Sequence, residues 1–245
     1  MRQSDAQPHP DADPVQVKAT GLARTAALGG VAFLAFSAAS DLVIGPNPAS
    51  DAPLAKVTSF YATHHAQVLA GGMLLAWAAI FFALFGTAAW AGIRQAPVHP
   101  LLAGAALAGT AVTTAGLLAG ATAYATLGGI GGSRAIAPAA LQAWHIVGSQ
   151  LSLAVNGGMM IVLLAAAAAG FAARVLPRPL AWSALIIGLL QLTPAPIGFL
   201  ASLLALLWAA VAGVVMFVRP PGAPPAPGHT ARARARAHAS SAPAA

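Results

Sequence analysis

The sequence predicts an all-α protein, a polytopic transmembrane helical bundle with six spans and disordered cytoplasmic tails. Of its 245 residues, 58% are hydrophobic and 7% are charged, whereas soluble domains average about 25% charged residues. Long stretches without any charged residue separate Arg94, Arg134 and Arg174, and another lies between Arg178 and Arg219. Each exceeds the roughly 20 apolar residues that cross a bilayer, where a lipid-exposed loop could not satisfy its backbone.

The composition also excludes several classes of protein. So apolar a chain is neither a soluble enzyme, nor a coiled coil, nor a wholly disordered protein. Because the sequence contains no cysteine, disulfides, cysteine zinc sites, iron–sulfur clusters and thiol catalysis are excluded as well.

Turn-forming residues delimit the first three expected spans. The first runs from about Arg24 to Ile44 and stops at Gly45-Pro46-Asn47-Pro48. An alternative interpretation takes it as a signal peptide cleaved after Ala38-Ala39-Ser40. The second span runs from His64 to about Gly92, and the third from Pro100 to about Leu127.

The second half of the chain predicts three further spans. Gly128 to Ser133 reads as a flexible loop, and the fourth span runs from Ala139 to about Ala173. The apolar stretch from Leu180 to Val218 is too long for one crossing, and Thr193-Pro194-Ala195-Pro196 divides it. A tight hairpin here gives six spans, whereas one kinked helix gives five and places the termini on opposite sides.

The distribution of basic residues predicts the orientation. With six spans and a cytoplasmic N-terminus, Lys56 and Arg134 are the only basic residues that lie on the outer side of the membrane. The positive-inside rule then places both termini in the cytoplasm, with the protein in the inner (plasma) membrane of a bacterium. Ten basic residues fall on the cytoplasmic side: Arg2, Lys18, Arg24, Arg94, Arg174, Arg178, Arg219, Arg232, Arg234 and Arg236.

The domain organisation is a membrane domain, residues 21–218, between two disordered tails. Residues 1–20 are too polar to bury a core, and residues 219–245 are rich in Pro, Ala and Arg. The C-terminal arginines have no interleaved aromatic residues, so nucleic acid is not an expected partner. They either attract anionic lipid headgroups or only help to fix the topology; they are Arg232, Arg234 and Arg236.

Polar residues recur along the fourth expected span at steps of three or four, which places them on one helix face. Polar groups in a membrane normally face the bundle interior or a water-filled cavity. This face predicts either a polar path or ligand site that opens to the outside, or hydrogen bonds between helices. Its members are Gln142, His145, Ser149, Ser152 and Asn156.

The expected topology places Asp41, His64, His65 and His145 toward the same outer side. Such a set could hold zinc with an open water position, bind haem through axial imidazoles, or relay protons. The sequence has no HxxxH or HExxH spacing, and no cofactor is predicted. The alternative is that Asp41 pairs with Arg134 or a histidine while His64 and His65 face lipid headgroups.

The sequence has no Walker A, dinucleotide-binding, nucleophile-elbow or N-terminal lipidation motif. We therefore expect a non-enzymatic membrane component that binds a small ligand, a lipid or a partner, the partner being another membrane protein or a second copy of the chain. A metal- or haem-dependent enzyme that uses the Asp/His cluster and a proton-coupled transporter are the alternatives.

Two short segments resemble a known group of proteins. Ser59-Phe60-Tyr61-Ala62-Thr63-His64-His65 leads into a long apolar helix that ends in Ile93-Arg94, and Ala172 to Trp182 contains Leu176-Pro177-Arg178-Pro179-Leu180 before the last hairpin. Both are similar to segments of the DUF4386-type six-helix bacterial membrane proteins, although Pro179 stands where that turn usually has Trp. The resemblance implies six spans and carries no activity.

Overall fold

Long apolar helices make up most of the protein. The structure, a computed structural model, describes residues 21, 24–131, 137–193 and 197–219. The expected disordered tails, Arg134 and the three tail arginines lie outside these residues. Within them the chain forms six helices and no strand, which confirms the all-α class. The helices are α2 (Gly29–Ile44), α3 (Leu54–Gln95), α4 (Pro100–Gly131), α5 (Pro138–Ala173), α6 (Arg178–Leu190) and α7 (Ile197–Val218).

Five of the described helical segments are long and apolar enough to cross a membrane, namely α3, α4, α5, α7 and the segment Arg24–Ile44 that contains α2. The sixth helix, α6, has 13 residues. At 1.5 Å per residue it is only about 20 Å long, less than the roughly 30 Å of a hydrocarbon core. The large exposed side chains of the bundle are mostly Leu, Ile, Val, Phe and Trp, as a lipid-facing surface requires.

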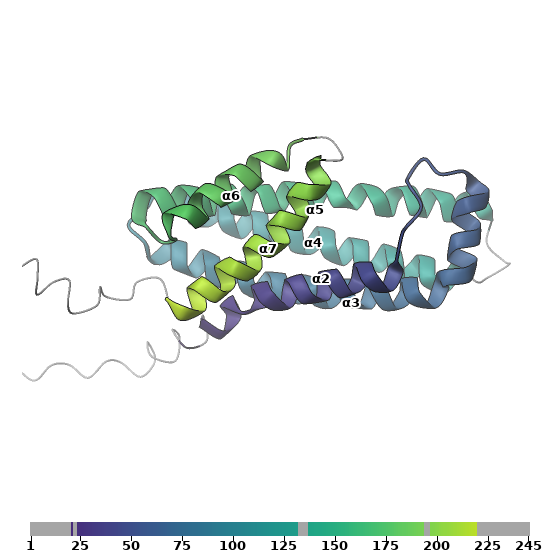
Figure 1. The fold of residues 1–245 in the computed structure, drawn as a ribbon, viewed down its shortest axis with the longest axis horizontal. Coiled ribbons are helices and arrows are strands. Elements are labelled where there is room, and N and C mark those ends of the chain that lie inside the picture. The colour runs from purple at the N-terminus through teal and green to yellow at the C-terminus, as the bar shows by residue number, and fades with distance from the viewer. Residues whose placement is uncertain (1–20, 22–23, 132–136, 194–196, 220–245) are drawn as a thin grey trace, which may run out of the picture.

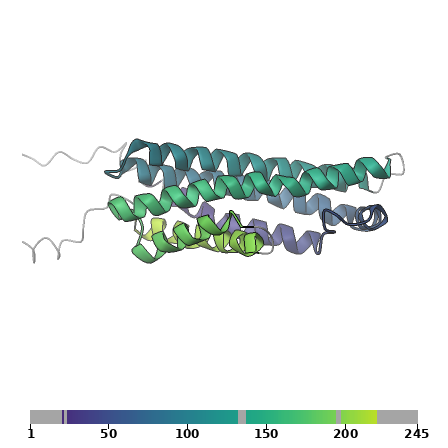
Figure 2. The same cartoon turned by 90° about the horizontal axis from the view of Figure 1, so that it is seen from above.

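The helices pack in chain order as a closed ring. Each contacts the next, and α7 returns to α2. The long helices α3, α4 and α5 lie side by side (Figure 1). The other three helices, α2, α6 and α7, lie on one side of them (Figure 2). The main apolar core lies between these two layers and includes Phe33, Phe82, Leu163 and Trp208.

Both ends of the described chain meet at one end of the bundle. The Arg24 Nε donates a hydrogen bond to the Phe217 carbonyl oxygen over 2.6 Å, and the guanidinium lies over the Phe217 ring. We call this the arginine end, because all arginines of the described residues lie at helix ends here (Figure 1): Arg24, Arg94, Arg174, Arg178 and Arg219.

The last two helices form an antiparallel hairpin, as expected, and are not one kinked helix. The Trp208 Nε1 of α7 donates to the Leu180 carbonyl oxygen near the start of α6, over 3.1 Å. Ser202, near the start of α7, contacts Gln191 at the end of α6 and Asn156, midway along α5. The hairpin therefore starts at the arginine end and its turn reaches only the middle of α5.

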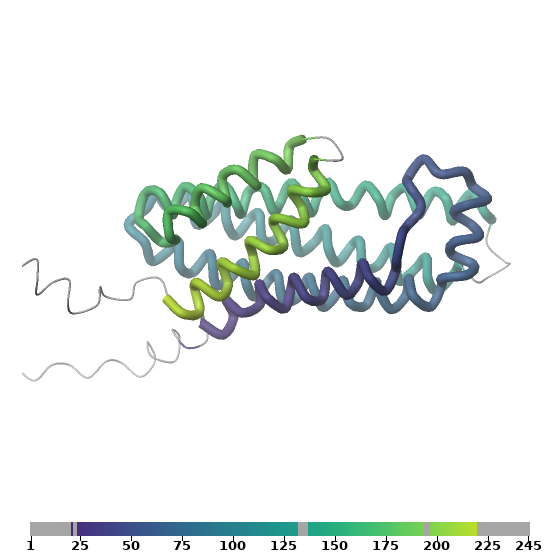
Figure 3. Tube along the Cα trace, in the orientation of Figure 1, coloured from purple at the N-terminus to yellow at the C-terminus, as the bar shows by residue number. Residues whose placement is uncertain are grey.

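The opposite end of the bundle is closed by a strap, residues 45–53, and by the first turns of α3. The backbone of α3 leaves helical geometry at His64, with φ −112° and ψ 16°. Residues 54–63 consequently lie crosswise to the rest of α3, and the strap runs beside them from the end of α2 to their start (Figure 3). The predicted start of the second span, at His64, coincides with this kink.

The prediction of a flexible loop from Gly128 to Ser133 is wrong for its described part, because α4 continues to Gly131. The glycines serve close packing instead. A Cβ on Gly131 would lie 2.7 Å from the Tyr61 carbonyl oxygen, and one on Gly128 would lie 2.5 Å from the Leu69 backbone nitrogen. The helix can approach α3 this closely only where side chains are absent.

Glycines also join α4 to α5. A Cβ on Gly109 would lie 2.7 Å from the Gly158 carbonyl oxygen, and one on Gly158 would lie 2.5 Å from the Thr113 backbone nitrogen. In lipid, helices associate largely through such van der Waals contact, since the surrounding chains are as apolar as the side chains. The Gly109–Gly158 contact is thus a main support of the bundle.

We expect Gly158→Leu to destabilise the protein by about 1–3 kcal/mol, because the new side chain must push the α4 and α5 backbones apart. Thermal unfolding in one detergent measures this. The matched control is Gly157→Leu on the same helix, since nothing lies within 4 Å of a Cβ there. Equal loss of stability in both variants would contradict the proposed contact.

Candidate functional site

A buried histidine holds the strap against the helices. The His145 side chain is 2% exposed and lies against Tyr61, which is fully buried. The Tyr61 hydroxyl lies 2.8 Å from the His145 Nδ1, and the His145 Nε2 lies 3.3 Å from the Ala49 carbonyl oxygen. One imidazole therefore links α5, the first turns of α3 and the strap.

The partners of His145 define its tautomer. The Ala49 carbonyl can only accept, so the proton of a neutral ring is on Nε2. The bare Nδ1 then accepts the hydrogen of the Tyr61 hydroxyl. Both ring nitrogens are engaged, so a metal or haem iron could bind His145 only after one of these hydrogen bonds broke.

Further hydrogen bonds tie the strap to α5 and α4. The Gln142 Nε2 donates to the Ala52 carbonyl oxygen over 3.5 Å. The Asn47 Nδ2 donates to the Tyr124 hydroxyl over 3.1 Å. Beneath them lies an apolar cluster of Ile44, Ala52, Val57, Tyr61, Val68, Leu127 and Leu141. Two of the predicted polar residues, Gln142 and His145, therefore secure a closed end of the bundle.

The other members of the expected Asp/His cluster lie apart. Asp41 is exposed near the end of α2. The His64 Nδ1 lies 3.1 Å from the Phe60 carbonyl oxygen of its own helix, and the His65 Nδ1 lies 3.4 Å from that of Ala62. Among the described residues, no group of three His, Asp or Glu side chains could hold a metal ion. The described contacts thus give the zinc and haem hypotheses no support.

The rest of the predicted polar face has different neighbours. Ser149 and Ser152 donate to carbonyl oxygens of their own helix, those of Ile146 and Ser149. Asn156 lies one turn further along, where its Oδ1 is 3.1 Å from the Ser202 Oγ of α7. The structure brings Gln142 and His145 to the strap and Asn156 to the hairpin, with the two serines between these two contacts.

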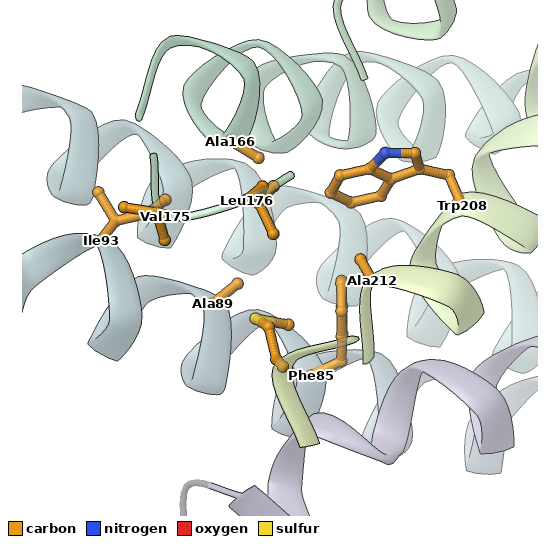
Figure 4. Close-up of a pocket in the computed structure, with 9 residues that line it drawn as sticks. Phe85, Ala89, Ile93, Ala166, Val175, Leu176, Trp208 and Ala212 are labelled. Carbon is orange, nitrogen blue, oxygen red and sulfur yellow. The ribbon is translucent and has the colours of Figure 1, made fainter. Parts of the chain in front are cut away.

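An apolar pocket at the arginine end is a feature that sequence reasoning did not identify. It is small, with a cavity volume of about 20 Å³, and is partly open to the outside. Its walls come from α3, α5, α7 and the connection between α5 and α6, as Figure 4 shows. The lining residues are Phe85, Ala89, Ile93, Ala166, Val175, Leu176, Trp208, Ala212 and Met216.

The pocket adjoins the positive end of the protein. Ile93 and Val175 of its lining are neighbours in sequence of Arg94 and Arg174, both exposed. The Arg94 guanidinium lies over the Trp90 ring. The acidic residues that the structure describes, Asp41 and Asp51, belong to the other end, in α2 and the strap. The pocket and the arginines therefore lie at the same end of the bundle.

No protein-family model matches the sequence, and neither a curated protein nor a solved structure matches it. The resemblance to DUF4386-type proteins accordingly remains a prediction.

We expect His145→Ala to loosen the strap, because it leaves the buried Tyr61 hydroxyl without its partner and removes the only link from α5 to the Ala49 carbonyl, which keeps the Ala52 N–H. An unsatisfied buried group of this kind costs about 1–3 kcal/mol. The chain has no cysteine, so a single Ala52→Cys, at a position 7% exposed, reports strap opening through its rate of thiol labelling. Labelling should accelerate in His145→Ala.

The control for this measurement is His65→Ala, at an exposed histidine on the same end of the bundle, which should leave labelling unchanged. Tyr61→Phe should fall between the two, because it removes one of the two hydrogen bonds. If His145→Ala labels as slowly as the control, the histidine does not hold the strap.

Proposed function

We propose that this chain is a non-enzymatic integral membrane protein that binds the hydrocarbon chain of an anionic lipid or fatty acid. The observation that carries the proposal is the apolar pocket at the arginine end. All nine lining residues are apolar, so the pocket offers no hydrogen bond to a polar substrate. Its volume of about 20 Å³ suits the end of an alkyl chain whose remainder lies along the surface of the protein.

The charge beside the pocket supports an anionic headgroup. A basic residue near a membrane surface attracts anionic lipid by about 1 kcal/mol, and Arg94 and Arg174 are the residues next to the lining positions Ile93 and Val175. The pocket wall is also well anchored, because the Trp208 indole nitrogen is hydrogen-bonded to the Leu180 carbonyl oxygen. This geometry favours a lipid or fatty acid whose hydrocarbon chain enters the pocket and whose headgroup lies at the arginines.

The same proposal includes the topology. We propose six membrane segments in a bacterial plasma membrane, with α6 and α7 as the last pair and with the arginine end and both tails in the cytoplasm. The contact between Arg24 and Phe217 supports termini on one side, and the positive-inside rule supports the cytoplasm as that side. Arg232, Arg234 and Arg236 would add to the attraction for anionic headgroups.

The metal or haem enzyme, the proton-coupled transporter and the partner-binding protein remain alternative hypotheses. No contact among the described residues favours any of them over the pocket. His145, on which the enzyme hypothesis relied most, has both nitrogens engaged within the fold.

We expect a brominated fatty acid to quench the fluorescence of Trp208 in a variant that keeps this tryptophan alone. Ala89→Leu should weaken binding by about tenfold, since the added carbons displace roughly two methylene groups of the ligand at about 0.8 kcal/mol each. Titration of quenching in detergent micelles of fixed composition measures the affinity. Ala115→Leu, at an exposed position of α4, is the control and should not change it.

We expect Arg94→Gln to weaken binding of the fatty acid by about fivefold, the effect of about 1 kcal/mol per basic residue. The same variant should bind a brominated alcohol of equal chain length as the wild type does. Saturable quenching that no pocket or arginine substitution alters would show that the ligand lies elsewhere, and the proposed function would fail.

The topology makes a separate prediction. A reporter enzyme that works only in the cytoplasm should be active when fused after Ala245. A reporter enzyme that works only outside the cytoplasm should be active when inserted at Ala195. A C-terminal reporter active outside the cell would reverse the proposed orientation.

A further inference from the structure

The strap is attached to the helices through a side chain that changes its charge near neutral pH. In the described part of the chain, side-chain hydrogen bonds between the strap and the helices come from Asn47, Gln142 and His145. Amides do not titrate, whereas an ordinary imidazole gains its second proton between about pH 5 and 8. The charge of His145 is therefore the feature of this attachment that responds to pH.

A second proton on His145 does not fit the closed strap. In the neutral ring the Nε2–H donates to the Ala49 carbonyl oxygen, and the bare Nδ1 accepts the hydrogen of the Tyr61 hydroxyl. A proton added to Nδ1 must donate to the phenol oxygen, which turns the hydroxyl hydrogen away from the ring. Tyr61 is fully buried, and its hydroxyl has no second partner among the described residues. That hydrogen consequently loses its acceptor.

The added charge also lacks compensation in the closed arrangement. The His145 side chain is 2% exposed, and its described hydrogen-bond partners, a phenol and a backbone carbonyl, carry no charge. Burying an unpaired charge is strongly unfavourable. The carboxylates of Asp41 and Asp51 are exposed, where solvent screens their attraction. The charged or titratable groups on the described elements around His145 are Asp41 of α2, Asp51 of the strap, Lys56, Tyr61, His64 and His65 of α3, and Tyr124 of α4.

The strap begins at a residue that can act as a hinge. The φ of Gly45 is 72°, in the left-handed region, and nothing lies within 4 Å of a Cβ there. Glycine changes its dihedral angles at little steric cost, so the strap can swing at this point. Most strap residues are exposed, and the buried ones are Pro48 and Ala52. Without the His145 contact, these two small side chains and the two amide hydrogen bonds hold the strap.

His145 lies far enough from the arginine end to sense the aqueous phase beyond the membrane. It precedes Arg174, the cap of α5, by 29 residues, which corresponds to about 43 Å along the helix. Even at a tilt of about 40° this leaves about 33 Å along the membrane normal, more than a hydrocarbon core of about 30 Å. With the arginine end at one membrane surface, the strap therefore lies in or beyond the opposite headgroup layer.

We propose that the strap is a lid that opens in acid. Protonation of His145 releases residues 45–53 from the end of the bundle and uncovers the apolar cluster that contains Tyr61 and Leu141. The closed strap holds the neutral ring, whereas the open strap leaves the imidazolium in water, so the open fraction rises as the pH falls through the range in which histidine titrates. The membrane placement in the proposed function decides only which compartment acts on the strap, and the pocket has no part in it.

The test measures the distance between two spin labels as the pH changes. The chain has no cysteine, so Ser50→Cys in the strap and Ala115→Cys on α4, both at exposed positions, carry the labels specifically. Double electron–electron resonance on the full-length chain in nanodiscs should give one narrow distance at pH 8 and a second, broader distribution at pH 5. The open-to-closed ratio should rise by up to about tenfold per pH unit, the slope for one proton.

His145→Gln separates this residue from the other titratable groups. The glutamine amide can accept from Tyr61 and donate to Ala49 but cannot titrate, so the strap should stay closed at both pH values. The matched control, His65→Gln, changes an exposed histidine at the same end of the bundle and should keep the response. Unchanged distances in the labelled chain that keeps His145, or a response that persists in His145→Gln, would overturn the proposal.

Should His145→Gln fail to fold or to close, the other titratable groups decide the question in chains that keep His145. Asp41→Asn, Asp51→Asn and His64→Gln should each retain the full change between pH 8 and pH 5. Loss of the change in any one of them would assign it to that group and contradict the role of His145. Nanodiscs expose both ends of the bundle, so these results do not depend on the orientation or on lipid binding, which the reporter fusions and the quenching titration test separately.

Discussion

The close contact of α4 with α3 and α5 is the interaction on which the rest of this structure depends. In a bilayer, apolar side chains gain little by leaving lipid for one another, so helices must approach closely to gain packing energy. Here glycines provide that approach, at Gly109 and Gly158 between α4 and α5 and at Gly128 and Gly131 between α4 and α3. The three long helices become a rigid wall, and both the strap and the hairpin are attached to it.

The lengths of the helices then determine where lipid and solvent meet the protein. The wall helices have 32 residues in α4, 36 in α5 and 32 in the part of α3 that follows the kink, residues 64–95. These lengths correspond to about 48–54 Å of helix, well beyond a hydrocarbon core of about 30 Å. The hairpin ends midway along α5, at Asn156. The arginine-end half of α5 therefore packs against both α4 and α6, while the other half packs against α4 and the strap. This division places an apolar pocket at one end and a hydrogen-bonded closure at the other.

Much of this architecture could be predicted from the sequence because it depends on local patterns. Stretches without charged residues predicted the helices, and Thr193-Pro194-Ala195-Pro196 predicted a hairpin between the last two. The expected start of a span at His64 coincides with the kink in α3. The partners of the polar groups could not be predicted, because they join distant segments: His145 meets Tyr61 and Ala49, and Asn156 meets Ser202. Tyr61 did carry a sequence signal, since it follows the buried Val57 by four residues, the spacing of one helix face. The pocket left no sequence signal, because its alanines and larger apolar residues resemble the many others along these helices.

The polar face of α5 shows that helical periodicity predicts which residues share a face but not which neighbours they contact. Gln142, His145, Ser149, Ser152 and Asn156 do lie on one face, but their neighbours change along it from the strap to the hairpin. Between these two neighbours the serines have only carbonyls of their own helix as partners, and Ser152 is exposed. A hydroxyl that donates to a carbonyl of its own helix needs no partner on another helix, whereas the side-chain amide of Asn156 has the Ser202 hydroxyl of α7 as its partner. The unequal partners of these groups thus follow from a hairpin that is shorter than the helix against which it packs.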